Sequence, residues 1–292
     1  MLIDPVVVYR SARRAACDER AFVLTAVLIS NEIVEHDGQF ALCVGQREAA
    51  HAAHHLHQYD EERRRPRPTM PPLKLHAEAW RGALAYVLVL IGIAIVAGQH
   101  WFTADLFDVG AASRSGIGAG QWWRAWTALT LHWDLEHLFG NLGAGALFGY
   151  FAAQQLGNGR AWLLITLGAG IANLIEATVV SDGFVSAGAS TAVFATVGLI
   201  AAHAWRQRRA FVLPGWRRIA PLIGGVMLLA WLGTAGEHTD VLSHGLGFLC
   251  GAALGALSVS KLGAAWLERI PQRWAAGIAI GVLALCWTLA LR

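Results

Sequence analysis

Residues 186–195 read Ser-Ala-Gly-Ala-Ser-Thr-Ala-Val-Phe-Ala. This run of small side chains leads into an apolar segment, so it predicts the start of a helix that packs closely against its neighbours. Ser190 falls in the first turn of that helix, where backbone N–H groups lack partners within the helix and the helix dipole is positive. The position suits an oxyanion that develops beside a serine hydroxyl. A serine at a helix start is also an ordinary cap, so this stretch alone leaves both interpretations open.

The composition around this helix indicates a membrane protein. The 292-residue chain is 55% hydrophobic and only 15% charged, which is too apolar for an ordinary soluble protein. Apolar stretches near the length that crosses a bilayer recur from residue 80 onward. They are residues 82–98, 138–153, 161–180, 187–205, 219–235, 241–259 and 274–291. We therefore expect an all-α polytopic membrane protein built as a six-helix bundle plus one extra helix.

A small soluble domain is expected before the membrane segments. Asp37-Gly38 has the chemistry of a hairpin turn between two strand-like runs, and a helix is expected from about Gln46 to Glu62. The sequence then reads Arg-Arg-Arg-Pro-Arg-Pro-Thr-Met-Pro-Pro from residue 63, a stiff basic spacer. The expected domains are an α+β unit at 1–62, a linker at 63–79, a membrane core at 80–260, and an amphiphilic connector with the seventh helix at 261–292.

The distribution of positive charge predicts the orientation. Arginines and lysines gather in the spacer, in residues 206–218 and in residues 261–273. Short cytoplasmic loops hold the excess of such residues, and with seven helices all three segments share one side. The chain is therefore expected to lie in the inner membrane of the cell, with its amino terminus in the cytoplasm. Asp182 and Asp240 are expected on the opposite face of the membrane.

A histidine inside the sixth apolar segment is the natural partner of the serine. His244 is followed by Gly247 and Gly251, and glycines at four-residue spacing allow very close helix approach. If this ridge packs on the helix that Ser190 begins, the imidazole comes within hydrogen-bonding reach of the serine hydroxyl. A serine is a weak nucleophile until a positioned base takes its proton. Phe194 shares the face of Ser190 and is placed to support the imidazole ring.

The second apolar segment carries two further polar side chains near its outer end. His137 and Asn141 are four residues apart and share one face. Together with the backbone N–H of Ser190, they are candidate donors to the oxygen of a tetrahedral intermediate. His132 lies close by, but its five-residue spacing from His137 puts the two histidines on different faces, so we expect no metal site. No cofactor is expected, and arginines confined to loops argue against a nucleic-acid partner.

Four separated motifs now carry a family resemblance. They are Trp123-Arg124, His137-x-x-x-Asn141, Gly188-Ala-Ser190 and His244-x-x-Gly247-x-x-x-Gly251. In order, they resemble the Trp-Arg pair of the first extramembrane loop, the oxyanion pair of the second helix, the nucleophile motif, and the base with its packing ridge in the rhomboid intramembrane serine proteases. The resemblance covers about residues 80–260.

This resemblance implies a rhomboid-like six-helix core whose catalytic cavity opens to the non-cytoplasmic face. It further implies a Ser-His dyad without an obligatory acid, an acyl-enzyme, and transmembrane protein substrates taken from the lipid bilayer. His132 falls where the family has a further histidine near the active site. Two alternatives stay open: a catalytically silent rhomboid-like protein that binds membrane clients, and a small-solute transporter. The transporter is opposed by the absence of two matching broken-helix halves.

The chain departs from the family pattern at two places, and one further role stays open. Thr191 stands where many members carry glycine directly after the nucleophile. The acidic residue that many members place near the inner end of the second helix is replaced, since residues 151–157 read Phe-Ala-Ala-Gln-Gln-Leu-Gly. Asp240, one turn before His244, is either a helix cap or a third member that orients the imidazole. Asn173 and Glu176 are expected to pair inside the bundle rather than to take part in the chemistry, and no role is assigned to them.

Overall fold

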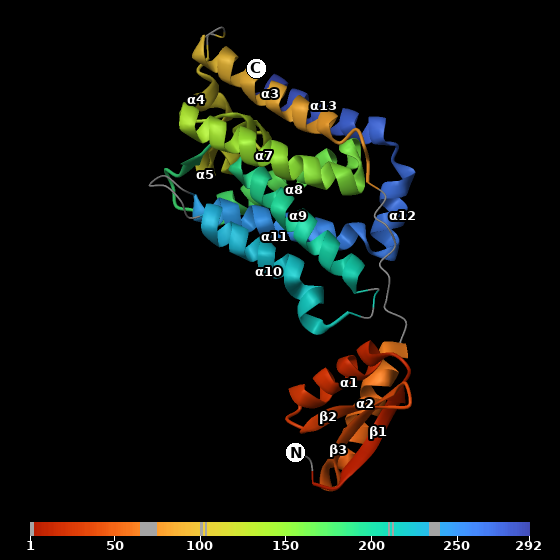
Figure 1. Ribbon diagram of the computed structural model, residues 1–292. Helices are drawn as coiled ribbons and strands as arrows, with labels where there is room; N and C mark the ends of the chain where they lie inside the picture. Colours follow the sequence, from red (N-terminus) through yellow and green to blue (C-terminus); the bar gives the residue numbers. More distant parts are fainter. Residues whose placement is uncertain are drawn as a thin grey trace. The chain divides into compact units, whose positions relative to one another are not determined.

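The computed structural model describes residues 3–64, 75–99, 102, 104–209, 211, 213–233 and 240–292. The chain divides into two compact units, Met1–Thr69 and Met70–Arg292, and the second is helical almost throughout (Figure 1). Most of the basic, proline-rich stretch expected as a linker, residues 65–74, lies outside the described residues.

The amino-terminal unit is a three-stranded antiparallel sheet with two helices. Its elements are β1 (Pro5–Ser11), α1 (Arg14–Ala26), β2 (Asn31–His36), β3 (Gln39–Gly45) and α2 (Ala49–Arg64). The strand order is β1-β3-β2. Asp37 and Gly38 both have positive φ, 50° and 70°, so the β2–β3 hairpin turns at the Asp-Gly pair as the sequence predicts. The helices meet the sheet around a core of Leu24, Ile29, Leu42, Val44, Ala52 and Leu56.

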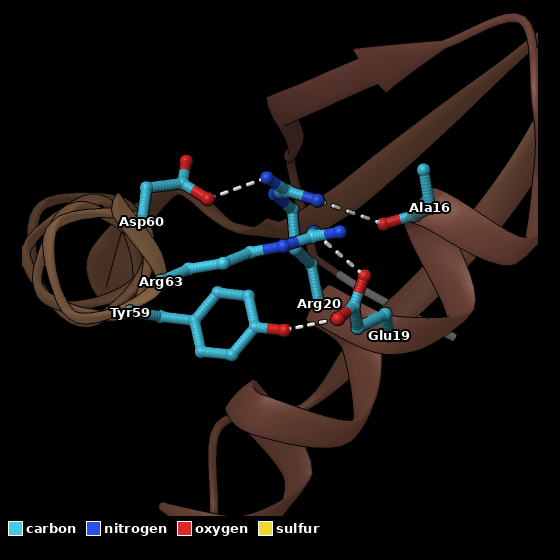
Figure 2. A network of polar contacts seen from close by, with 6 residues as sticks. All are labelled: Ala16, Glu19, Arg20, Tyr59, Asp60 and Arg63. Atoms are coloured by element: carbon cyan, nitrogen blue, oxygen red, sulfur yellow. Dashed lines mark hydrogen bonds and ion pairs between the residues drawn. The ribbon is translucent and has the colours of Figure 1, made fainter. Parts of the chain in front are cut away.

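A buried arginine joins the two helices of this unit. Arg20 on α1 is 7% exposed, and its guanidinium donates to the Asp60 carboxylate of α2 at 2.5 Å and to the carbonyl of Ala16 at 3.2 Å (Figure 2). The guanidinium also lies 3.9 Å from the centroid of the Tyr9 ring. Two nitrogens of the planar group are therefore hydrogen-bonded, and the Tyr9 ring packs on its face.

A second, exposed set of contacts lies beside it. The Tyr59 hydroxyl donates to the Glu19 carboxylate, which also accepts from Arg63 at 2.9 Å (Figure 2). The hydrogen bond from Tyr59, followed by the positive charge of Arg63, holds the pKa of Glu19 below its ordinary value. Because these side chains are largely solvated, the network adds little to stability.

The two arginines give a matched prediction. We expect Arg20→Ala to lower the free energy of unfolding of the amino-terminal unit by roughly 2 kcal/mol, because charge-assisted hydrogen bonds are lost and Asp60 keeps a partly buried charge. Arg63→Ala should change it by no more than about 0.5 kcal/mol, since its ion pair is exposed. Hydrogen exchange of the α1 and α2 amides in the full chain measures both effects, and equal protection in the two variants would contradict the role of Arg20.

Each apolar segment expected from the sequence overlaps a long helix of the second unit. These helices are α3 (Trp80–Gly98), α7 (Leu135–Leu156), α8 (Asn158–Val179), α9 (Ser190–Arg208), α10 (Gly215–Leu232), α11 (Val241–Ser258) and α13 (Gln272–Ala290). Shorter elements connect them: α4 (Leu106–Gly110), β4 (Ala112–Ser113), α5 (Arg114–Gly118), α6 (Arg124–Thr127), β5 (Val185–Ser186) and α12 (Lys261–Arg269). The chain is a multi-pass membrane protein.

The long helices differ in mean hydropathy, and a helix that is surrounded by other helices needs fewer apolar side chains than one that faces lipid. By length and mean hydropathy, α3, α8, α11 and α13 can cross a membrane. Helix α9 does not reach that hydropathy, and it lies against α7, α8, α10 and α11 at the centre of the bundle (Figure 1). Polar side chains on such a helix face protein rather than lipid, so they do not prevent insertion.

Helices α9 and α11 pack very closely against each other. A Cβ added at each of three α11 glycines would overlap a backbone carbonyl of α9: Gly247 on Thr191, Gly251 on Ala195, and Gly255 on Leu199. The spacing along both helices is the same, so the helices run side by side in one direction. Their starting residues, which include Ser190 and His244, are therefore held at one end of the bundle.

Candidate active site

The segment that leads to Ser190 is fixed on both sides. Strand β5 pairs with β4, and the N–H of Gly188 donates to the carbonyl of Ala128 at 3.0 Å. Gly188 has φ +154°, and a Cβ there would overlap the His137 ring. Glycine is required at this position for its conformation and for the space that His137 occupies. Ser190 then begins α9.

His244 is oriented by a backbone carbonyl. Its Nδ1 lies 2.9 Å from the oxygen of Gly233, at the end of α10. A carbonyl oxygen only accepts, so Nδ1 carries the hydrogen, and in the neutral ring Nε2 is unprotonated. The Phe194 ring lies against the imidazole, with centroids 4.4 Å apart and planes at 38°. His244 is therefore held in one orientation and one tautomer.

The chain neighbours of the two residues contact each other. The hydroxyls of Thr191 and Ser243 form a buried hydrogen bond, and Gly247 lies on the Thr191 carbonyl one turn further along. The first turns of α9 and α11 are therefore joined directly beside Ser190 and His244. Thr191, which replaces the glycine common in the family, provides the hydroxyl for this bond.

The two histidines of the α7 region flank the segment that leads to Ser190. Asp134 caps α7 by accepting from the N–H of His137 at 2.7 Å, which fixes the first turn of that helix. The rings of His132 and His137 lie edge to face with centroids 5.2 Å apart. The Nε2 of His132 accepts from the N–H of Ala189 at 3.3 Å. His132 therefore supports the residue that precedes Ser190.

Asn141 offers a free donor. Its side chain is 6% exposed, and its Nδ2 has no acceptor among the described residues. The backbone at this position is fixed by a hydrogen bond of 2.8 Å from the Tyr86 hydroxyl to the Asn141 carbonyl. A buried N–H group without an acceptor is unfavourable unless a bound molecule supplies one. The unpaired group lies one turn after His137 on the same helix.

The comparisons with known proteins agree with the sequence motifs. Residues 119–261 match the rhomboid domain, a stretch that includes every motif described above. The chain belongs to the rhomboid family. Rhomboid protease GluP of Bacillus subtilis (strain 168) is 31% identical over 191 residues, which is 64% of this chain and 37% of the relative. Rhomboid-like protease 2 of Toxoplasma gondii is 30% identical over 146 residues, 48% of each protein. The chain thus spans less than half the length of both relatives.

In this rhomboid, the Trp123-Arg124 pair builds the loop between α3 and α7. Arg124 donates to the carbonyls of Ala111 at 2.9 Å and Asp108 at 2.8 Å, and Trp123 packs on the central core. Asn173 of α8 donates to the carbonyl of Ala125 at 2.8 Å. The Asn173 amide nitrogen is therefore paired inside the bundle, and it anchors the loop rather than the segment that leads to Ser190.

The Asp240 carboxylate lies beside the candidate site, and its hydrogen bonds go to residues other than His244. It accepts from the N–H of Ser243 at 3.0 Å and from the Ser186 hydroxyl at 3.0 Å. The first contact makes Asp240 the cap of α11, which is one of the two interpretations that the sequence allows. The second contact ties β5 to the start of the helix that carries His244. Sequence reasoning missed Ser186 and Ser243, although both are small polar residues close to the motif residues along the chain.

Proposed function

We propose that this rhomboid is an intramembrane serine endopeptidase in which Ser190 is the nucleophile and His244 its general base. The observation that carries the proposal is the state of His244. Its Nδ1 is bound to the Gly233 carbonyl, so the lone pair of Nε2 is available on the helix that faces the start of α9. This is the role that a triad carboxylate performs in soluble serine proteases, here met by a backbone oxygen.

The reaction follows from these positions. The Ser190 oxygen attacks the scissile carbonyl carbon while Nε2 of His244 takes the hydroxyl proton. The tetrahedral intermediate collapses, the proton moves from His244 to the leaving amine, and an acyl-enzyme remains. His244 then activates a water molecule that hydrolyses the ester. The candidate oxyanion donors are the N–H of Ser190, the unpaired Nδ2 of Asn141 and the ring of His137.

The proposed substrates are transmembrane segments of other proteins, cleaved near the non-cytoplasmic boundary. In a helix each peptide carbonyl is hydrogen-bonded and shielded, so the segment must unwind locally before Ser190 can attack. Substrates with helix-weakening residues near that boundary should be preferred. The charge distribution supports an inner-membrane location with a cytoplasmic amino terminus, because the arginine-rich segments share the side opposite Ser190.

A fluorophosphonate probe tests the proposal, since it reacts only with an activated serine. Wild-type protein in detergent or liposomes should be labelled, and Ser190→Ala and His244→Ala should not. Ser115→Ala is the matched control, because Ser115 is an exposed serine on the short helix α5 of the same unit. This variant should be labelled like the wild type. A folded wild-type protein that never labels would favour the client-binding or the transporter alternative.

The donor role of Asn141 gives a second prediction. We expect Asn141→Ala to lower kcat by about 100-fold with little change in KM, because the lost donor acts on charge that develops only in the transition state. Steady-state cleavage of a transmembrane peptide measures both constants. A rise in KM at unchanged kcat would instead assign Asn141 to substrate binding.

A further inference from the structure

An elongated cavity opens between helices α3, α8 and α13. Its volume is about 380 Å³, and its walls are mostly apolar. Figure 1 shows α3 and α13 next to each other along one side of the helical unit, and both contact α8. The lining residues run along α13 from Gln272 to Leu283, which corresponds to roughly 16 Å at the rise of an α-helix. This length is about half of the hydrocarbon core of a bilayer, so the cavity has the depth of one leaflet.

One end of the cavity is basic. Arg81 and Arg273 line it at the second residue of α3 and of α13, and Asn158 and Gln272 line it at the first residue of α8 and of α13. Asn158 Oδ1 accepts from the N–H of Gly82 at 3.0 Å, and Gln272 Oε1 accepts from an N–H of α8 at 3.1 Å. The three helices therefore start together, and the positive ends of their dipoles add to the charge of the two arginines.

The other end is apolar and lies behind the candidate active site. Leu90 of α3 and Leu283 of α13 line it, together with Leu129 and Ala192. Ala192 follows Ser190 by two residues on α9. A charged or strongly polar group would lose its hydration in this part without a partner, whereas a hydrocarbon chain would not. The cavity therefore fits a molecule with an anionic head and an apolar tail.

Two donors in the basic half have no partner among the described residues. The Nε1 of Trp162 is buried and unpaired, although its ring stacks on Tyr86 with centroids 5.1 Å apart and planes at 22°. Arg273 has no hydrogen bond or ion pair in that part of the chain. Arg81 pairs with Glu78 at 2.7 Å, but both side chains are exposed, so the pair is weak and can give way to a stronger anion. A buried N–H without an acceptor is unfavourable unless a bound molecule supplies one.

We propose that this cavity binds one phospholipid with an anionic head group. The phosphate lies between Arg81 and Arg273, an ester carbonyl of the glycerol accepts from the Nε1 of Trp162, and one acyl chain fills the apolar part. Free phosphate lacks the chain, and a neutral lipid lacks the net negative charge that the two arginines favour. The bound lipid joins α3 and α13 to α8, and the end of its chain contacts Ala192 behind Ser190. The inference does not depend on catalysis by Ser190.

Lipid binding to the full chain in detergent tests this proposal, with phosphatidylglycerol as the probe. Native mass spectrometry should detect one retained molecule, and the unfolding temperature should rise with its concentration. Phosphatidylcholine with the same acyl chains should bind at least about fivefold more weakly, because its choline group offsets the negative charge. Glycerol phosphate, which has no acyl chain, should leave the unfolding temperature unchanged. Equal binding of the two lipids would contradict the role of the arginines.

Two arginines on neighbouring helices make a matched comparison. Arg273→Gln should weaken the binding of phosphatidylglycerol about fivefold. Arg269→Gln removes the same charge from an exposed position on α12 that does not line the cavity, and it should change the affinity by less than about twofold. Equal losses in the two variants would mean that the lipid responds to the surface charge as a whole, which contradicts a specific site.

The apolar part of the cavity is tested by adding bulk to it. Ala85 of α3 lines the cavity, so Ala85→Leu should weaken the binding of both lipids. Gly92→Leu is the control on the same helix, because a Cβ at Gly92 meets no atom within 4 Å and the residue does not line the cavity. This variant should bind both lipids like the wild type. Unchanged binding by Ala85→Leu would place the lipid elsewhere on the protein.

The unpaired indole N–H gives the last test. Trp162→Phe keeps a ring against Tyr86 and loses the N–H, so it should weaken the binding of both lipids about fivefold. If this variant fails to fold, the comparison of Arg273→Gln with Arg269→Gln still decides the question. A wild type that retains no lipid, and whose α3 and α13 cross-link to a second copy, would contradict the proposal. Because binding is measured without activity, a protein that binds the lipid but is never labelled by the fluorophosphonate contradicts only the proposed function.

Discussion

Replacing His244 by alanine should lower kcat for peptide cleavage by at least about 10⁴-fold, and Ser190→Ala should cause a loss of similar size. The reason is that neither group works without the other. The serine hydroxyl is not nucleophilic without a base, and the base has no proton to take without the serine. The double variant should therefore be no slower than either single variant. Losses that multiply in the double variant would show that the two residues act independently.

The same two helices supply a matched control for this prediction. At their other ends, Nδ1 of His203 on α9 lies 2.7 Å from the Ser258 hydroxyl on α11, which is a buried serine–histidine contact. Both nitrogens of His203 are engaged, since Gln207 bonds Nε2 at 2.9 Å. The Ser258 hydroxyl donates to the Gly255 carbonyl and sits at a helix end, where the dipole opposes an oxyanion.

Ser258→Ala should therefore leave kcat unchanged, with at most a small loss of stability. The comparison isolates what a serine–histidine contact needs before it becomes catalytic: a free ring nitrogen and a helix start. Cleavage assays on all four variants, normalised to folded protein, make the test. A fall in kcat for Ser258→Ala comparable to that for His244→Ala would mean that the assay reports damage to the fold rather than to the chemistry.

The helix packing beside the candidate site could be predicted from the sequence because it is set by local patterns. The Gly247 and Gly251 spacing identifies the face of α11 that approaches α9, and a Cβ at either glycine would overlap a backbone carbonyl of α9. The Asp37-Gly38 pair predicts its hairpin for a similar reason, since few residues adopt positive φ without strain. Patterns of this kind depend on near neighbours along the chain.

The contacts that orient the site residues could not be predicted, because they join distant segments and leave no pattern in the sequence. The partner of His244 is the carbonyl of Gly233, and any residue provides a carbonyl. The start of α9 at Ser190 rather than residue 187 reflects the φ of Gly188. Such contacts appear only once the helices are in place.

Gly251→Val should be strongly destabilising. A Cβ at Gly251 would overlap the carbonyl and Cα of Ala195, which are backbone atoms and cannot move aside without separating the helices. In a membrane the hydrophobic effect does not drive helices together, so close packing must supply most of the association. We expect at least about 3 kcal/mol of destabilisation, together with the loss of fluorophosphonate labelling.

Gly245→Ala is the control on the same helix, because a Cβ at Gly245 meets no atom within 4 Å. This variant should be as stable as the wild type or slightly more so, since alanine is the better helix former. Thermal unfolding in detergent measures both variants, with labelling of Ser190 as the readout of the native site. If Gly251→Val unfolds at the wild-type temperature but fails to label, the ridge aligns Ser190 with His244 without being needed for the fold. Equal unfolding and equal labelling would contradict the contact between α9 and α11 on which the proposed dyad depends.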